Sequence, residues 1–248
     1  MRLKRLQKHW DAFGEQDPLW AILTRPDKKG NRWDRNEFFR SGALEVEGVM
    51  AYAASLGVRL RRRSALDFGC GVGRLTAALA AHFEEVVGVD IAPSMIRRAR
   101  EWTTNERCRF VLNETDDLRP FEDGRFDLVY TNIVLQHIPT RHVRRYLGEF
   151  VRVLAGGGLL IFQLPAGPRP TGGAASLKAR LKSRLPAPVR AAWDTLRRRG
   201  EFPRMDMHVM PPDEVKQVVD KAGARVLDIV PDQSAGPSWL GYRYCVTR

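Results

Sequence analysis

The stretch LDFGCGVGRLT, residues 66–76, carries three glycines spaced two residues apart, with Asp67 ahead of them. An apolar run, SALDF, leads into it, and apolar residues at helical spacing follow over 73–83. Glycine lets a backbone take unusual angles and approach a ligand closely. Because ligands of a doubly wound sheet bind beside the turn after its first strand, this stretch predicts a ligand-binding turn between a strand and a helix.

The acids around this turn indicate the kind of ligand it takes. The pattern is D-x-G-x-G-x-G without a lysine. An acid suits an ammonium group better than a phosphate, so Asp67 favours a ligand with an amino-acid head over a pyrophosphate. Asp90 ends the next apolar run, EVVGVD, 21 residues after Gly69, and an acid there can accept hydrogen bonds from both ribose hydroxyls.

Strand and helix patterns alternate from residue 64 onward, which predicts a parallel sheet with helical crossovers. The expected strands are 64–69, 85–90, 109–114, 126–132 and 159–164, and the expected helices are 73–83, 93–102 and 140–154. A further helix over 213–222 and two closing strands, 224–230 and 242–248, complete the pattern.

The chain divides into four parts on this interpretation. We expect an N-terminal helical cap segment (1–63), a ligand-binding core (64–164), a basic helical lid insertion (165–205), and a closing helix with two strands (206–248). In the cap segment, Trp10, Trp20 and Trp33 are expected to form a wall of the site. In the insertion, two apolar faces repeat at helical spacing: Leu177, Leu181 and Leu185, then Val189, Trp193 and Leu196.

The charge of the chain is uneven. Net charge is +12, and the ten basic and two acidic residues of 165–205 contribute +8 of it. This insertion is open to three interpretations: a lid over an anionic or sugar-like substrate, a helix pair on a membrane surface or partner, or a solvated basic face. A nucleic-acid partner is disfavoured, because the arginine- and alanine-rich composition is typical of GC-rich genomes and no base-stacking module is visible.

Several classes of protein are excluded by what the chain lacks. No run approaches the roughly 20 apolar residues of a membrane span, and the N-terminus does not resemble a secretory signal. The three cysteines, Cys70, Cys108 and Cys245, lie far apart and form neither a metal-binding spacing nor a disulfide framework. We therefore expect a cytoplasmic protein without a dedicated metal site, and the sequence leaves its oligomeric state open.

Four blocks in register carry a resemblance to the class I S-adenosylmethionine-dependent methyltransferases. They are LDFGCGVGRLT (66–76), VVGVDIAPSMIRRAR (86–100), FDLVYTNIVLQHIP (126–139) and RVLAGGGLLIF (152–162). The resemblance implies an α/β fold with a doubly wound, Rossmann-like seven-stranded sheet, parallel except for one antiparallel strand, and helices on both faces. It also implies S-adenosyl-L-methionine as cofactor and S-adenosyl-L-homocysteine as product.

The same resemblance assigns residues to the parts of the cofactor. For the methionine part it implies Asp67, the backbone of Gly69, Cys70, Gly71 and Gly73, the strand-end pair Thr131 and Asn132, and Arg40 near the carboxylate. For the adenosine part it implies Asp90 at the ribose, Ile91 and Met95 around the adenine, and Glu114 or Asp116 at its amino group. The alternatives are a core position for Met95, solvated loop positions for the two acids and a surface position for Arg40.

Two histidines are candidates for a catalytic base. Methyl transfer to a hydroxyl needs one, and His137 follows the fourth strand while His208 lies where the insertion returns to the sheet. The alternative for each is a structural histidine; His9, His82 and His142 are expected at the surface.

Three functions remain open on the sequence. The first is methylation of a small molecule, at a hydroxyl oxygen of a sugar-like or secondary metabolite. The second is methylation of a lipid or membrane-associated substrate, and the third is a cofactor-binding interaction module without catalysis. The segments DPLWAILTRP, WDRNEFFRSG and LQHIP resemble bacterial methyltransferases of small molecules and glycan-related metabolites, which favours the first.

Overall fold

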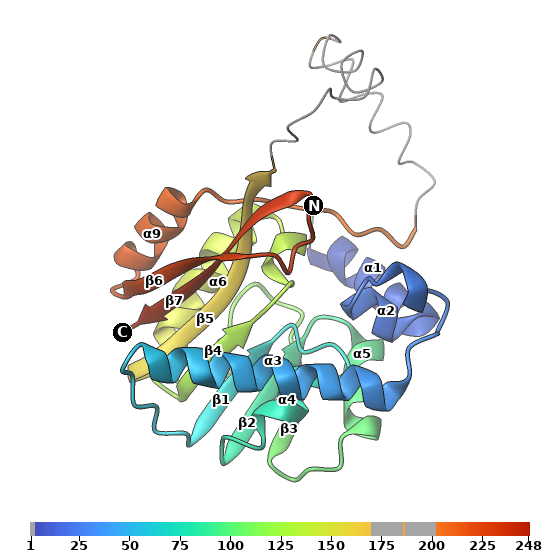
Figure 1. Cartoon of the computed structure of the whole chain (residues 1–248), viewed down its shortest axis with the longest axis horizontal. Coiled ribbons are helices and arrows are strands. Elements are labelled where there is room, and N and C mark those ends of the chain that lie inside the picture. Colours follow the sequence, from blue (N-terminus) through green and yellow to red (C-terminus); the bar gives the residue numbers. More distant parts are fainter. Residues whose placement is uncertain (1–2, 170–185, 187–201) are drawn as a thin grey trace.

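Seven strands pair in the order β3-β2-β1-β4-β5-β7-β6 (Figure 1). The computed structural model describes residues 3–169, 186 and 202–248. Only β7 runs antiparallel to its neighbours β5 and β6, so the expected mixed, doubly wound sheet is confirmed. The strands are β1 (Ser64–Phe68), β2 (Glu85–Asp90), β3 (Cys108–Leu112), β4 (Phe126–Thr131), β5 (Leu154–Pro168), β6 (Arg225–Asp232) and β7 (Trp239–Thr247).

The strand order reverses between β1 and β4. The chain winds outward from β1 through β2 to β3 and then returns to pair β4 with β1. Crossovers on the two sides of such a switch point diverge, which leaves a crevice beyond the carboxyl ends of the strands. The glycine turn follows β1 and therefore lies at this crevice.

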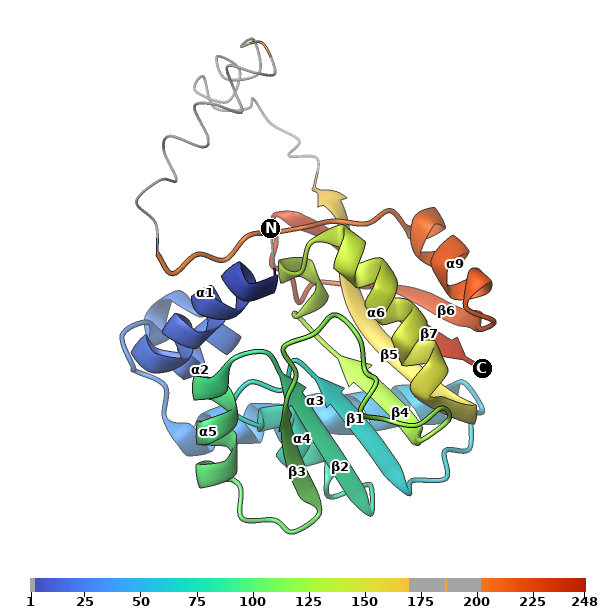
Figure 2. The ribbon, with the colours of Figure 1, turned by 180° about the vertical axis from the view of Figure 1, so that it is seen from behind.

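Helices cover both faces of the sheet. On one face lie α3 (Arg35–Ser55) and α4 (Arg74–Leu79), with α5 (Pro93–Trp102) beside β3 (Figure 1). On the other lie α6 (Thr140–Val153) and α9 (Pro212–Lys221) (Figure 2). The helix α3 thus forms a layer of the core, although the sequence placed it within the cap segment.

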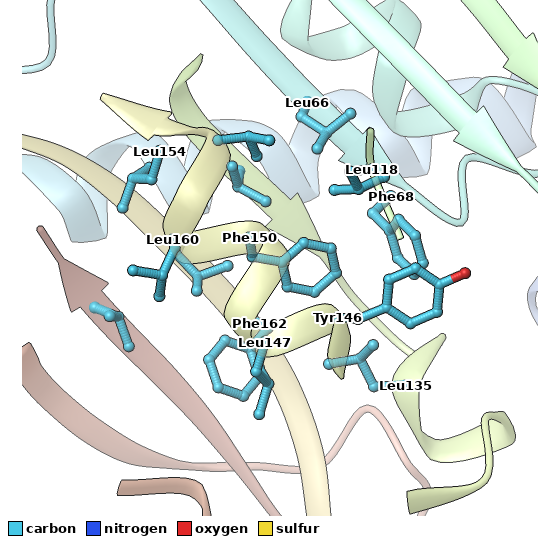
Figure 3. Packing of buried hydrophobic residues seen from close by; sticks show 14 of the residues in the cluster. Leu66, Phe68, Leu118, Leu135, Tyr146, Leu147, Phe150, Leu154, Leu160 and Phe162 are labelled. Carbon is cyan, nitrogen blue, oxygen red and sulfur yellow. The ribbon is translucent and has the colours of Figure 1, made fainter. Parts of the chain in front are cut away.

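The larger core cluster joins α6 to the middle strands (Figure 3). The Phe68 ring lies 4.9 Å from that of Phe150 and 4.6 Å from that of Tyr146, between ring centroids. Phe150 is fully buried and Tyr146 nearly so, and burial of such side chains contributes about 1.5–3 kcal/mol each to folding. This packing fixes the end of β1, from which the glycine turn starts.

Two short helices cap the ligand edge. They are α1 (Leu3–Gln16) and α2 (Pro18–Ile22), which lie together in Figure 1; a 3₁₀ turn, η1 (Pro26–Lys28), follows. The first is anchored on α5, because the Ser94 backbone N–H donates to Asp11 Oδ1 at 2.8 Å and the Ser94 hydroxyl donates to the Asp11 carbonyl at 2.8 Å.

Two expected boundaries are wrong. The fifth strand extends from Leu154 through Pro168, beyond the expected 159–164, because β7 pairs with it as far as Pro168. Since β4 already ends at Thr131, this part of β5 has a free side, where proline is tolerated. The helix expected over 73–83 is shorter, because α4 ends at Leu79.

The two amphipathic helices expected in 165–205 lie outside the described residues, so the lid stays a prediction. Residues 202–210, here called the returning strap, lead back to the core. The strap is held by three backbone hydrogen bonds: Arg204 N–H to His9 Nδ1 (3.1 Å), His208 N–H to the Gln136 carbonyl (2.6 Å) and Met210 N–H to the Pro165 carbonyl (3.0 Å). Gln136 belongs to a second 3₁₀ turn, η2 (Leu135–His137). None of the described helices has the length and hydropathy to cross a membrane.

Candidate active site

The glycine turn has the backbone conformation that its sequence predicts. Gly69, Gly71 and Gly73 have φ angles of 77°, 54° and 89°, in the left-handed region that favours glycine. A Cβ on Gly69 would collide with Val134, and one on Gly71 would approach the Ile22 side chain. Bare backbone is therefore required at both places.

Asp90 ties the end of β2 to this turn. Its Oδ2 accepts the Gly71 N–H at 2.9 Å, and its Oδ1 accepts the Ala92 N–H at 2.8 Å. Burial raises the pKa of this carboxyl, while the backbone donors of Ala92 and Gly71 oppose the rise. Each oxygen keeps capacity for another donor, so the carboxylate can accept a pair of ribose hydroxyls.

A cavity lies between the turn and the N-terminal cap. Its apolar wall on the side of the N-terminal cap, here called the roof, consists of Leu3, Leu6 and Trp10 of α1 and Ile22 of α2. Of the three tryptophans expected at the site, Trp10 alone is among these lining residues; the Trp33 ring instead packs edge-on against Phe38.

The end of the cavity near β3 suits a flat base. Ile91, Met95 and Tyr146 line it, and Met95 is buried in a helix at the same time. Asn113 also lines this end and donates through its side-chain amide to the Thr115 and Asp117 carbonyls.

Glu114 and Asp116, the acids expected at the end of the cavity near β3, bond to other residues. Glu114 accepts a hydrogen bond from the Gln7 amide at 2.7 Å, and Asp116 lies 2.9 Å from His142 Nδ1 and 3.0 Å from Arg145. Neither is among the lining residues, because Glu114 lies against Gln7 of α1 and Asp116 lies against α6. The expectation that Glu114 or Asp116 lies at the adenine stays a prediction.

The other end of the cavity, near β4, is polar. Asn132 lines it, donates to Glu45 Oε1 at 2.7 Å and has a buried Oδ1 without a partner among the described residues. Thr131 is fully buried and is not among the lining residues. Of the expected strand-end pair, only Asn132 therefore faces the cavity.

Asp67 stands behind the turn rather than in the cavity. Its carboxylate is buried and accepts the Thr76 hydroxyl at 2.6 Å, which ties β1 to α4. Burial raises its pKa to about 7, although the Thr76 hydrogen bond opposes the rise. Asp67 is not among the residues that line the cavity, and its expected contact with an ammonium group stays a prediction; Cys70, buried, lines the cavity.

The arginine at the cavity is Arg74 rather than Arg40. Arg40 is exposed on α3 and is absent from the cavity wall, because it faces away from the sheet. Arg74, the first residue of α4, lines the cavity and is 2% exposed. The sequence offered a signal for it, an arginine directly after the last glycine of the turn.

His137 is a bracing residue in this arrangement. Its Nδ1 lies 2.9 Å from the Asp206 carbonyl, to which it donates because a carbonyl only accepts, and its Nε2 lies 3.2 Å from the Gln136 amide nitrogen. Burial lowers the pKa of His137 to about 4. With both ring nitrogens engaged, His137 holds the returning strap to η2.

His208 keeps a free ring nitrogen. Its Nε2 is buried and has no partner among the described residues, and burial lowers its pKa, so the ring is neutral at pH 7. Two histidines expected at the surface are in fact buried: His9, packed against Phe202 with 5.0 Å between ring centroids, and His142, beside Asp116.

Comparison with known proteins identifies the family. Residues 66–162 match the methyltransferase domain family. The chain is 38% identical over 105 residues to trans-aconitate 2-methyltransferase of Methylobacterium radiotolerans, across 42% of this chain and 38% of that one. It is 28% identical over 132 residues to ubiquinone biosynthesis O-methyltransferase of Xanthomonas campestris pv. campestris (strain B100), across 52% and 45% of the two chains.

A solved structure matches the whole chain. Magnesium protoporphyrin IX methyltransferase from Synechocystis PCC 6803 with bound S-adenosylhomocysteine aligns with a TM-score of 0.65 and 17% identity, over 99% of both chains. Residues 66–162 thus match a methyltransferase domain, and the fold is that of class I S-adenosylmethionine-dependent methyltransferases, two of whose solved structures hold S-adenosylhomocysteine or S-adenosylmethionine. The chain spans less than half the length of the two curated relatives named above.

The residues of the cavity fit this cofactor. Four features follow one another along the strand ends: an apolar pocket near β3, the Asp90 carboxylate after β2, the bare glycine backbone after β1 and a polar end near β4. No group of three histidine, cysteine or acidic side chains that could hold a metal ion occurs within 3–169, 186 and 202–248.

Proposed function

We propose that the protein transfers the methyl group of S-adenosylmethionine to a hydroxyl oxygen of a small, sugar-like or secondary metabolite. The observation that carries cofactor binding is the Asp90 carboxylate, fixed by two backbone N–H groups at the mouth of the glycine turn. The bound cofactor supplies a methyl group on a positively charged sulfur. The protein's part is to hold both reactants in line and to exclude water.

A polar acceptor is supported by buried hydrogen-bonding groups near the strand ends. Asn132 Oδ1, Gln136 Oε1 and both amide atoms of Gln163 are buried without partners among the described residues. Gln163 and Asn132 directly follow Phe162 and Thr131, the last residues that pair between β5 and β4. Of these residues Asn132 lines the cavity; since buried polar groups are normally hydrogen-bonded, a hydroxyl group of a ligand would satisfy its Oδ1 better than an alkyl chain.

His208 is the base we propose for the hydroxyl proton; it is not among the residues that line the cavity, and its backbone N–H donates to the Gln136 carbonyl in the segment after β4. A neutral imidazole with an unengaged nitrogen can accept a proton, whereas both nitrogens of His137 are engaged. An oxygen acceptor also agrees with the name of the ubiquinone biosynthesis O-methyltransferase relative.

Isothermal titration with S-adenosylhomocysteine tests the cofactor site. We expect one binding event per chain, and at least a tenfold loss of affinity in Asp90→Asn, because a hydrogen bond to a charged group contributes about 1.5–3 kcal/mol. Asp220→Asn, an exposed aspartate of α9, is the matched control and should bind like the parent. No heat with the parent, or unchanged affinity in Asp90→Asn, contradicts the proposal.

The acceptor is tested with methyl-labelled cofactor and a panel of monosaccharide derivatives, phenols, carboxylic acids and vesicles of phosphatidylglycerol. Label in the hydroxylated small molecules supports the proposal. Label found only in the vesicles or only in the acids would replace it with a lipid or a carboxylate acceptor.

A further inference from the structure

The residue after Asn132 has an unusual backbone conformation. Ile133 has a φ angle of 53°, in the left-handed region that β-branched residues rarely occupy. Among the described residues, the other non-glycine residues with a positive φ are Asn31 and Arg62, and neither is β-branched. Such strain is found mostly at functional positions, so we asked what Ile133 contributes.

The left-handed backbone sets the direction of three side chains. Successive side chains of an extended strand point to opposite faces, yet Asn132, Ile133 and Val134 all line the cavity. Val134 also lies against the glycine turn, since a Cβ on Gly69 would collide with it. The turn at Ile133 therefore brings one polar and two apolar side chains to the same wall.

The side chain of Ile133 is the feature that its backbone does not explain. A glycine would take the same φ without strain, as Gly69, Gly71 and Gly73 do in the glycine turn. Core packing does not explain the isoleucine either. Ile133 is partly exposed, and it is not among the residues that form or pack against the hydrophobic clusters of the described chain. A strained apolar side chain in a cavity wall is thus suited to contact a ligand.

The position of Ile133 indicates which ligand it contacts. The apolar end that suits a flat base lies near β3, whereas Ile133 follows β4, which lies beyond β1 in the strand order. Its neighbour Asn132 has a buried Oδ1 without a partner among the described residues. A hydrogen-bond acceptor followed by an apolar side chain fits a ligand that carries a hydroxyl group on an apolar skeleton.

We propose that Ile133 contacts an apolar face of the methyl acceptor and determines its specificity, so that the acceptor is a phenol or a similar hydroxylated apolar ring. The inference rests on the proposed function and narrows its acceptor class. A β-branched side chain is stiff at χ1 and offers the ring a rigid surface. A polyhydroxylated acceptor would instead place hydroxyl groups against this apolar surface, which is unfavourable unless they find hydrogen bonds.

Methyl NMR tests the contact directly. The full chain is prepared with isotope-labelled Cδ1 methyl groups on isoleucine and saturated with S-adenosylhomocysteine, and the Ile133 signal is assigned by its loss in Ile133→Val. Phenol and methyl α-D-glucopyranoside are titrated in separate experiments. We expect phenol to shift the Ile133 signal to saturation, because an aromatic ring changes the local field at a methyl group beside it. The glucoside should leave this signal in place.

Variants separate a ligand contact from a structural role. Ile133→Gly should unfold at the parent's urea midpoint or above it, since glycine removes the backbone strain, and should bind S-adenosylhomocysteine within about twofold of the parent. Its affinity for phenol, measured from the phenol signals, should fall at least about threefold, whereas Ile133→Val should keep most of it. The matched control is Arg62→Gly, which changes an exposed residue with a φ of 60° outside the cavity wall and should alter neither affinity.

An unshifted Ile133 signal with phenol, or an equal shift with the glucoside, overturns the proposal. So does unchanged phenol affinity in Ile133→Gly. A urea midpoint of Ile133→Gly below that of the parent would show that the side chain stabilises the fold, and it overturns the proposal as well. A parent protein that does not bind S-adenosylhomocysteine instead refutes the proposed cofactor site, so the two failures are distinguishable.

Discussion

Two carboxylates at the ends of neighbouring strands have different surroundings. Asp90 lines the cavity and accepts two backbone N–H groups, which oppose the rise in its pKa that burial causes. Asp67 accepts one hydroxyl in a fully enclosed position, and burial raises its pKa to about 7. Asp90 is therefore suited to accept hydrogen bonds from a ligand, whereas Asp67 joins β1 to α4.

At the same scale, His208→Gln tests the base. With the acceptor found in the panel, we expect kcat to fall about 10²- to 10⁴-fold while affinity for S-adenosylhomocysteine is unchanged. Burial lowers the pKa of His208 below its usual value, so the parent's rate should fall only at acid pH, and this fall should vanish in the variant. His82→Gln serves as control; a kcat equal to the parent's in His208→Gln rules out this base.

At the scale of elements, α2 and the glycine turn constrain each other. Gly71 has a left-handed backbone and faces the Ile22 side chain at the end of α2. The cap is therefore seated directly on the turn that binds the cofactor. The apolar stripe Leu3, Leu6, Trp10 and Phe13 lies along one side of α1 at helical spacing, and three of these four residues roof the cavity.

Gly71→Ala is expected to lower the free energy of unfolding by about 1–2 kcal/mol, because an L-residue in this conformation is strained. It should also weaken S-adenosylhomocysteine binding. Adding Ile22→Ala relieves the collision with α2 but not the strain, so part of the loss should remain.

Urea unfolding measures both variants of this pair. The matched control is Gly148→Ala in the interior of α6, where a Cβ meets open space and which should stabilise the protein by about 0.5–1 kcal/mol. A Gly71→Ala protein as stable as the parent would show that the turn does not need its left-handed backbone.

At the scale of the whole molecule, the returning strap joins parts far apart in the chain. It forms hydrogen bonds with His9 of α1 and with His137 of η2. The strap therefore links the N-terminal cap to the segment that follows β4. Both histidines are neutral in the folded protein, because burial lowers the pKa of each. Protonation therefore opposes this assembly.

The expected pH dependence follows from His137. Its folded pKa of about 4 lies below the model-compound value of 6.5, so the unfolded chain binds more protons between these values and stability falls as pH drops through that window. We expect the stability difference between the parent and His137→Gln to shrink from pH 7.5 to pH 5 by at most about 2 kcal/mol, because about 1.5 pH units of this range lie below 6.5. Urea unfolding at both values measures it, and a constant difference would contradict the buried, neutral histidine.

The order of strands and helices, the glycine turn and the acid closing the second strand could be predicted from the sequence. Each depends on neighbouring residues: apolar runs, helical spacing, and glycines where the backbone must be left-handed. The direction of side chains could not be predicted this way. Arg74 rather than Arg40, and Asn113 rather than Glu114 or Asp116, line the cavity.

Packing between segments that are far apart in the sequence decides which of these side chains line the cavity. Glu45 stands 29 residues before Arg74 and 87 before Asn132, and only the seating of α3 against the sheet brings the three together. Local sequence patterns determine which backbone the cofactor meets, because backbone conformation is a local property. Tertiary structure decides which charges it meets, because a side chain's direction depends on the helix that packs beside it.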